Sequence, residues 1–171
     1  MAPSLATLNG LGRDEFRRTL GGIFEHSPWV PERAFDRRPF ASVGDLHTAM
    51  TQVVQQASRE EQLALIRAHP DLAGRAARAG AMSTHSVAEQ SGAGLDRLTD
   101  EEYARFEHLN DAYRARFGFP FIIAVRRHDK YAILKAFEMR LGHSVDLEVD
   151  TALAQIAEIA RLRLDALAGA P

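Results

Sequence analysis

The chain has 171 residues, of which 46% are hydrophobic and 26% charged, and its formal net charge is −2 at pH 7. This length and composition predict one globular domain over residues 1–171, and the charge gives no basic face for binding nucleic acid. The chain has no cysteine, which excludes disulfides, iron–sulfur clusters, thiolate zinc sites and cysteine nucleophiles.

The sequence predicts neither a membrane segment nor a secretory signal. Its first residues lack the basic start and the apolar run of a signal peptide. The most apolar stretch, residues 119–125, is far shorter than the roughly 20 residues that a membrane-spanning helix needs. We therefore expect a cytoplasmic protein with no membrane partner.

Helical signals begin early in the chain. Apolar residues recur at helical spacing over residues 16–24, and three prolines at positions 28, 31 and 39 then indicate an irregular connector. Ser42 followed by Asp45 predicts a helix start. Ser58 and Glu61 form a capping box that opens the next helix. We expect that helix to end near His69, because a residue before proline is disfavoured in the helical region.

The second half of the chain also contains helical signals. Thr99 and Glu102 predict a capping box for a long helix that Gly118 closes. Further apolar periodicity predicts helices over residues 133–141 and 153–167. The apolar run 122–125 is rich in β-branched residues, and its local pattern is compatible with either an extended or a helical backbone. The sequence thus predicts an all-α fold.

The first candidate for chemistry is His69, which stands before Pro70 at a predicted helix end. Imidazole exchanges protons near neutral pH without any tuning of its pKa, so His69 is a candidate general acid or base. The structural alternative is a histidine that caps the last carbonyls of its helix, which the helix dipole favours. Position alone favours the capping role slightly.

The second candidate is the segment Ser86–Gln90. If Ser86 is an N-cap, Glu89 is its capping-box partner and both residues are structural. The functional alternative places Ser86, Glu89 and Gln90 on the first turn of a helix, where backbone N–H groups face an anionic ligand. Both roles are compatible only if Glu89 turns towards the site.

The third candidate is the run from Phe117 to Arg127. Its aromatic residues are typical of a protein core. Arg126 follows directly after the apolar run, and a guanidinium held by a rigid element can bind a carboxylate or a urea carbonyl. The structural alternative is a solvated arginine at the surface, which we expect for Arg127.

Two rival enzyme sites share these residues. His85 and Glu89 are four apart and could bind a metal together with His26, His69 and Asp71, although seven histidines make such a pair common by chance. Ser86, His69 and Glu89 could instead form a hydrolytic triad. The sequence has no Gly-x-Ser-x-Gly elbow for such a nucleophile.

Several uncommon strings occur in one order along the chain. They are His69-Pro70-Asp71-Leu72-Ala73-Gly74, Ser86-x-x-Glu89-Gln90, Gly92-Ala93-Gly94-Leu95, Leu109-Asn110 and Phe117-Gly118-Phe119-Pro120-Phe121. Phe24-Glu25-His26-Ser27-Pro28-Trp29 and Arg38-Pro39-Phe40 precede them. Together they resemble the OHCU decarboxylases, the 2-oxo-4-hydroxy-4-carboxy-5-ureidoimidazoline decarboxylases of urate breakdown.

This resemblance implies a helical enzyme that converts OHCU into (S)-allantoin and carbon dioxide, with neither a metal nor an organic cofactor, and usually as a homodimer. It implies that His69 is the proton donor, and Glu89 is expected to support it as a second catalytic residue. The expected substrate-binding residues are Pro70, Ser86, Val87, Ala88, Glu89, Gln90, Phe121, Ile122, Ile123, Ala124, Val125 and Arg126. The non-enzyme alternative is a helical interaction module whose aromatic loops bind a partner.

Overall fold

The computed structural model describes residues 2–74, 80 and 82–169 of the chain. Within these residues the regular structure is helical and no strand occurs, which confirms the predicted all-α fold. The chain divides into two compact units, one built from residues up to Ala68 together with those from Ala157 onward, and one from His69 to Ile156. The prediction of a single domain over residues 1–171 stays a prediction.

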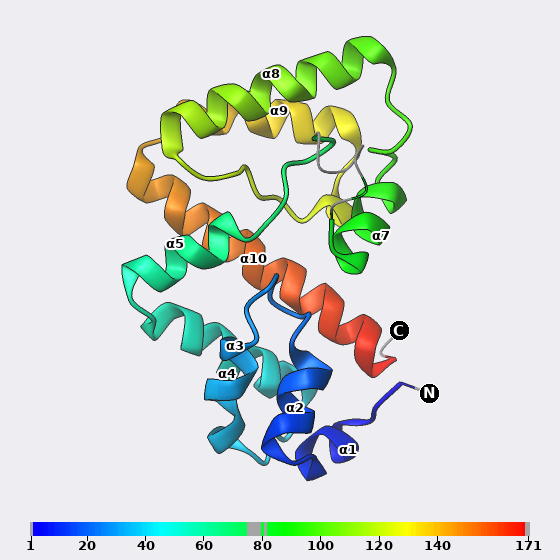
Figure 1. Cartoon of the computed structure of the whole chain (residues 1–171), viewed down its shortest axis with the longest axis vertical. Helices are drawn as coiled ribbons and strands as arrows, with labels where there is room; N and C mark the ends of the chain where they lie inside the picture. The colour runs from blue at the N-terminus through cyan, green and yellow to red at the C-terminus, as the bar shows by residue number, and fades with distance from the viewer. Residues whose placement is uncertain (1, 75–79, 81, 170–171) are drawn as a thin grey trace. The chain divides into compact units, whose positions relative to one another are not determined.

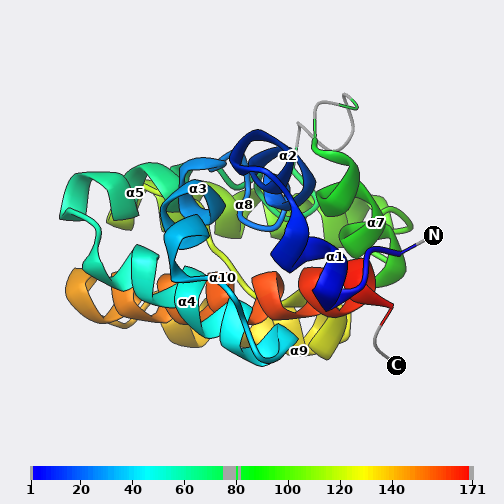
Figure 2. The same cartoon turned by 90° about the horizontal axis from the view of Figure 1, so that it is seen from below.

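The first unit contains the helices α1 (Leu5–Gly10), α2 (Arg13–Leu20), α3 (Trp29–Ala34), α4 (Val43–Gln56) and α5 (Arg59–Arg67), with the short 3-10 helix η1 (Phe35–Arg37). Helix α3 packs against both α2 and α4, and Figure 2 shows α3 beside α4. The carboxylate of Glu25 forms a buried ion pair of 2.8 Å with Arg163 in this unit.

The second unit contains α7 (Thr84–Gly92), α8 (Asp100–Phe117), the 3-10 helix η2 (Val125–Arg127) and α9 (Lys130–Arg140). Helix α10 (Val145–Ala168) begins in this unit and continues into the other. Helices α8 and α9 lie side by side (Figure 1). Three aromatic rings join them to the connector after α8: Phe121 stacks on Phe137 and meets Tyr113 edge to face.

The helix ends agree with the local signals of the sequence. The side chains of Ser42, Ser58 and Thr99 cap α4, α5 and α8, and the last two form complete capping boxes. Gly118 ends α8 in the left-handed conformation, with φ of 77°, which is accessible to glycine at little cost. None of the helices in the described part of the chain has the length and apolar character needed to cross a bilayer.

Candidate active site

His69 directly follows Ala68, the C-cap residue of α5, as the proline rule predicts. The cap residue Ala68 retains helical dihedral angles, and Pro70 stops the helix. The side chain of His69 is buried, with only 7% of its surface exposed. A histidine in this position is shielded from bulk water at the start of a loop that runs to Gly74.

The loop His69–Gly74 is joined to α7 by the side chain of Gln90. Its Oε1 accepts a hydrogen bond of 2.8 Å from the backbone N–H of Ala73, and its Nε2 donates to the carbonyl of Asp71 over 3.3 Å. The side-chain amide of Gln90 therefore provides hydrogen-bond partners for two backbone groups of the loop, which belongs to neither a helix nor a sheet. Gln90, which we predicted as a substrate ligand, has a second role as a support of the loop.

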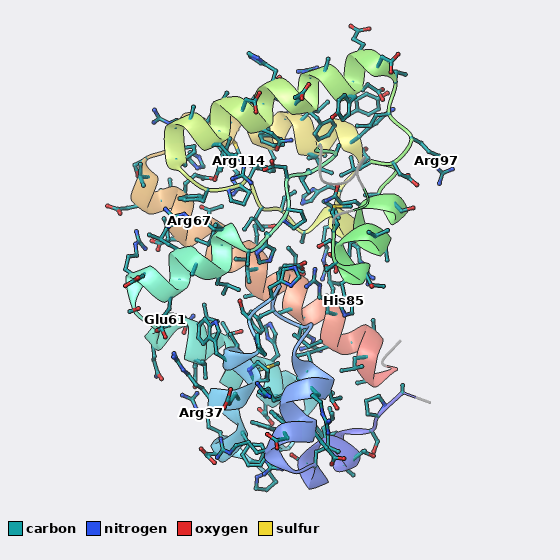
Figure 3. The ribbon with its side chains drawn as sticks, in the orientation of Figure 1. Arg37, Glu61, Arg67, His85, Arg97 and Arg114 are labelled. Atoms are coloured by element: carbon teal, nitrogen blue, oxygen red, sulfur yellow. The ribbon has the colours of Figure 1, made fainter. Side chains whose placement is uncertain are left out.

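Helix α8 holds the same loop from another direction. The buried amide of Asn110 donates a 2.8 Å hydrogen bond to the carbonyl of Leu72. The guanidinium of Arg114 donates from Nε to both carboxylate oxygens of Asp71, at 2.9 and 3.2 Å. Figure 3 labels Arg114 on α8. Two side chains one turn apart on α8 thus contact consecutive residues of the loop.

Ala73 shows how tightly the loop is held. Its φ is 49°, in the left-handed region that residues with a Cβ rarely adopt. Such a conformation costs roughly 1–2 kcal/mol and persists where the surroundings determine it. The hydrogen bond from its N–H to Gln90 is one contact that holds Ala73 in place.

The segment Ser86–Gln90 lies on α7, but its position in the helix differs from both sequence-based interpretations. The N-cap is Ser83, whose side chain accepts a hydrogen bond from the N–H of Ser86. Ser86 is therefore the third residue of the helix, and Glu89 belongs to the second turn. The expectation of a Ser86–Glu89 capping box is wrong, as is the placement of Glu89 and Gln90 on the first turn.

Burial divides this segment into two groups. Ser86, Glu89 and Gln90 are buried, and Glu89 is only 8% exposed, whereas Val87 and Ala88 lie on the exposed side of α7. A carboxylate that is not needed for capping and is nevertheless buried is a candidate for chemistry. Capping therefore does not account for the burial of Glu89, and its catalytic role stays a prediction.

The connector after α8 supplies the third part of the site. Residues 121–125 are all buried, and their backbone is neither helix nor strand up to Ala124, which answers the question that the sequence left open. Val125 then starts η2, against which α7 packs. The contacts of α7 with both the loop and η2 bring the three predicted segments into one region of the second unit.

Arg126 and Arg127 are both exposed. Within the described part of the chain, the guanidinium of Arg126 forms neither an ion pair nor a hydrogen bond with a side chain. It belongs to η2, whose short turn fixes the backbone from which the side chain extends. Arg126 is consequently available to an anionic or carbonyl ligand, and the interpretation as a solvated surface residue also stays open.

Sequence reasoning missed the side chains that hold the buried connector. Arg140 donates from Nη1 to the carbonyl of Ile122 over 2.7 Å, and Gln155 accepts from the N–H of Ala124 over 2.9 Å. Arg140 lies in the last turn of α9, where a sequence rule would assign it to the helix dipole. No local pattern indicates that it reaches back 18 residues to a carbonyl.

Arg140 belongs to a buried polar network around Glu148. Oε1 of Glu148 accepts hydrogen bonds of 2.6 Å from Arg140 Nε and from the Tyr113 hydroxyl, and Oε2 lies 2.9 Å from Nδ1 of His143. Burial and the hydrogen bond to Glu148 raise the pKa of Tyr113 well above its ordinary value of 10.0. Tyr113 is therefore a neutral donor to the carboxylate at any physiological pH.

A cavity of about 300 Å³ lies beside α7 in the same unit, and it overlaps the candidate site only at Val87 and Gln90, two of the predicted substrate-binding residues. Its lining includes Ala73, Val87, Gln90 and Tyr103, whereas His69, Ser86 and Glu89 do not contribute to it. The buried polar groups, rather than this mostly apolar hollow, therefore define the site.

The two rival enzyme sites gain no support. His85 is exposed on α7 while Glu89 is buried (Figure 3 labels His85), and the described residues contain no group of three or more potential ligands that could hold a metal ion. A hydrolytic nucleophile at Ser86 would sit inside the first turn of a helix. In the described residues there is no strand that could present it on an elbow.

Comparison with known proteins gives one consistent result. The family model for OHCU decarboxylase matches residues 9–165. The chain is 48% identical over 161 residues to a 2-oxo-4-hydroxy-4-carboxy-5-ureidoimidazoline decarboxylase of Haloferax volcanii, covering 94% of both chains.

Two solved structures have a similar fold. One is described as (S)-allantoin synthase and superposes with a TM-score of 0.77 at 33% identity, covering 96% of this chain and 54% of the other, so our chain spans about half of its length. The second is an OHCU decarboxylase crystallised in the presence of (S)-allantoin, with a TM-score of 0.70 over 92% of this chain and 99% of the other. At 19% identity, this second likeness supports the fold alone.

The helical fold and the relatives together define an enzyme of the decarboxylase class, a carboxy-lyase. The match to the family model covers most of the sequence, and the Haloferax relative is similar over nearly its whole length. The chain belongs to the OHCU decarboxylase family.

Proposed function

We propose that this chain converts OHCU into (S)-allantoin and carbon dioxide in urate degradation, with His69 as the proton donor. Decarboxylation of OHCU is the activity of the family to which the chain belongs. The observation that carries the assignment of residues is the burial of His69 in a loop that α7 and α8 hold at Leu72 and Ala73. A buried, well-held imidazole suits directed proton transfer.

The chemistry of OHCU explains why a proton donor and an orienting site are sufficient. The bond between the ring and the carboxylate breaks, and its electron pair passes into the adjacent ring C=N unit, whose nitrogen takes up a proton, so that the substrate is its own electron sink. A proton is then added to the ring carbon that bears the ureido group. The hydroxyl group loses a proton as its carbon becomes the carbonyl of allantoin. The enzyme must orient the carboxylate and protonate one face.

We assign roles to the remaining residues on the same basis. Glu89, buried on α7 near the loop, would hold the imidazole of His69 or a ring N–H of the substrate. Ser86 would bond to the ureido group or a ring amide. Gln90 lines the site and keeps the loop in place. Pro70 and the exposed residues Val87 and Ala88 stay predicted parts of the binding surface.

The connector 121–125 would form the apolar wall of the site, and Arg126 would bind the carboxylate or the urea carbonyl. An apolar surrounding favours loss of a charged carboxylate as neutral gas. A general acid contributes about 10²–10⁴-fold to a rate, so orientation and charge stabilisation must supply the remainder.

The decisive experiment couples urate oxidation and ring hydrolysis to this protein and follows allantoin optically. Fresh OHCU should give (S)-allantoin much faster with the protein than without it. Unchanged decay of OHCU, or racemic allantoin, would refute the proposed function. Because OHCU also decays without an enzyme, the optical signal separates enzymatic product from background.

We also propose that the chain forms a homodimer. The support is the exposure of large apolar side chains in the second unit, among them Tyr131 and Met139 on α9 and Leu147 on α10. Apolar side chains of this size at a surface are typical of protein interfaces. Light scattering after gel filtration should give twice the chain mass of 18.9 kDa, and the chain mass itself would refute the dimer. A cytoplasmic location stays a prediction from the sequence.

A further inference from the structure

The connector 121–125 is buried, and its residues up to Ala124 lie in neither a helix nor a sheet. Its last two carbonyls, of Ala124 and Val125, accept backbone hydrogen bonds from η2 and the residue after it. Buried backbone groups need partners, and a stretch without regular structure must find them in side chains. Two such partners are present: Arg140 for the carbonyl of Ile122 and Gln155 for the N–H of Ala124. These two bonds come from α9 and from the first half of α10.

Arg140 contacts the connector in two ways. Besides the 2.7 Å hydrogen bond to Ile122, the centre of its guanidinium lies 4.2 Å from the centre of the Phe121 ring. The planar guanidinium therefore determines both the position of a backbone carbonyl and that of the preceding side chain. Arg140 is only 4% exposed, so its contact with the connector is shielded from water.

Glu148 orients this guanidinium. Its carboxylate is 0% exposed and receives Nε of Arg140, which leaves Nη1 directed at Ile122. The Tyr113 hydroxyl binds the same carboxylate oxygen and restricts it further. His143 approaches the other oxygen from the turn between α9 and α10.

Stability alone is a poor reason for such a network. The free energy needed to remove two charges from water is often larger than the free energy gained from their attraction. A protein with an apolar pair of similar volume in the same place is commonly as stable as one with the buried ion pair. Nη2 of Arg140 is also buried without a hydrogen-bond partner among the described residues, which adds to the cost. The feature that an apolar pair could not reproduce is the bond to the Ile122 carbonyl.

We infer that Arg140, oriented by Glu148, and Gln155 are positioning residues that set the place of the connector 121–125 and hence of Arg126 in substrate binding. This inference rests on the proposed function, in which the connector and Arg126 contact the substrate. Neither positioning residue touches the substrate in this scheme. Both act through the backbone of the connector.

The inference predicts a particular kinetic signature. The loop of His69 is held by Gln90, Asn110 and Arg114, none of which belongs to the Glu148 network. Loss of Arg140 should therefore displace the connector 121–125 and leave His69, the proton donor, in place. Such a change weakens binding of the substrate and raises KM more than it lowers kcat.

The test is steady-state kinetics on freshly generated OHCU with Arg140→Met, which keeps an unbranched apolar stem and removes the guanidinium with all its donors. We expect KM to rise roughly tenfold while kcat stays within about threefold of wild type. Gln155→Leu, which removes the acceptor of the Ala124 N–H, should change KM in the same direction. Thermal unfolding of each variant shows that it is folded at the assay temperature.

A second variant separates an effect on substrate binding from an effect on folding. Arg140→Met leaves Glu148 as an unpaired buried charge, which by itself can unfold a protein. In Arg140→Met with Glu148→Gln no charge is left unpaired, and the glutamine still accepts from Tyr113. This double variant should be more stable than the single one and should keep the raised KM, because Ile122 still lacks its donor.

The matched control is Ile133→Ala, which shortens a fully buried side chain of the same helix and leaves the donor to Ile122 intact. It should lower the melting temperature and leave KM near the wild-type value. Equal rises of KM in this control and in Arg140→Met would mean that general loosening of α9 is the cause, and would overturn the inference.

The outcomes separate the inference from the proposed function. A wild-type chain that fails to accelerate the decay of OHCU refutes the function. An active wild type whose KM is unchanged in the folded Arg140 and Gln155 variants refutes only the positioning role. A loss confined to kcat would also overturn the positioning role, because that result would mean that the Glu148 network supports the proton donor and not the substrate-binding connector.

Discussion

Oε1 of Gln90 accepts a 2.8 Å hydrogen bond from the backbone N–H of Ala73, four residues beyond His69. This bond joins α7 to the loop that carries the proposed proton donor. It also falls on a residue with a positive φ, so the amide holds the loop in a conformation that it would not adopt freely. The geometry of His69 therefore depends on a side chain that lies 17 residues away from Ala73.

We expect Gln90→Leu to lower kcat by roughly 10- to 100-fold, because small displacements of a catalytic group have effects of this size. Leucine fills a similar volume but leaves the N–H of Ala73 and the carbonyl of Asp71 without this partner. The unfolding free energy should also fall, by about 1–3 kcal/mol for a buried group left unpaired. Allantoin assays and urea unfolding measure the two effects. His85→Ala on the exposed side of the same helix serves as the control, and it should retain wild-type turnover.

His69→Asn should fold normally and lower kcat by roughly 10²–10⁴-fold, the range associated with loss of a general acid. Asparagine is close in size and retains some hydrogen bonding but cannot supply a proton near neutral pH. Circular dichroism checks the fold and the optical assay checks turnover. Near-wild-type turnover in a folded variant would remove His69 from the mechanism.

Glu89→Gln distinguishes catalysis from helix capping. Because Ser83 caps α7 and Glu89 lies in the second turn, the substitution should leave the melting temperature close to that of wild type while turnover falls about 100-fold. The matched comparison is Ser83→Ala, which should lower stability by about 1 kcal/mol through loss of the cap. The reverse pattern, a less stable but fully active Glu89→Gln, would contradict a catalytic role for Glu89.

Glu61 provides a pH test in the first unit. Hydrogen bonds from Arg33 and from the backbone of Ser58 lower the pKa of Glu61 from 4.5 to about 2. A carboxylate with a lowered pKa adds stability above its ordinary pKa and loses it as the pH falls towards the value in the folded state. The stability advantage of wild type over Glu61→Gln should thus be constant above pH 5 and shrink between pH 4.5 and 2. Urea unfolding at a series of pH values measures it, and a pH-independent difference would contradict the assignment.

Much of the fold could be predicted from short-range rules. Ser42, Ser58 and Thr99 cap helices where the sequence indicates, and Gly118 ends α8 as expected. One exception is α7, because Ser83, Thr84 and Ser86 can all serve as N-caps and the local rule does not choose among them. Because Ser83 is the N-cap, the capping-box position three residues later is Ser86 and not Glu89. Two others are α3, which lies in the proline-rich stretch predicted as an irregular connector, and α10, which begins at Val145 and so before the predicted start at residue 153.

The sequence alone determined the helical class of the protein, several helix ends and the presence of His69 before Pro70, since each depends on residues a few positions apart. The partners of the site were decided by the tertiary structure: Gln90 with Asp71 and Ala73, and Arg140 with Ile122. These partners lie 17 to 19 residues apart and involve backbone groups, which every residue carries. Because every residue has a backbone carbonyl, the residue type does not indicate which carbonyl accepts a hydrogen bond from a distant side chain. Only the packing of the helices determines which side chain reaches it.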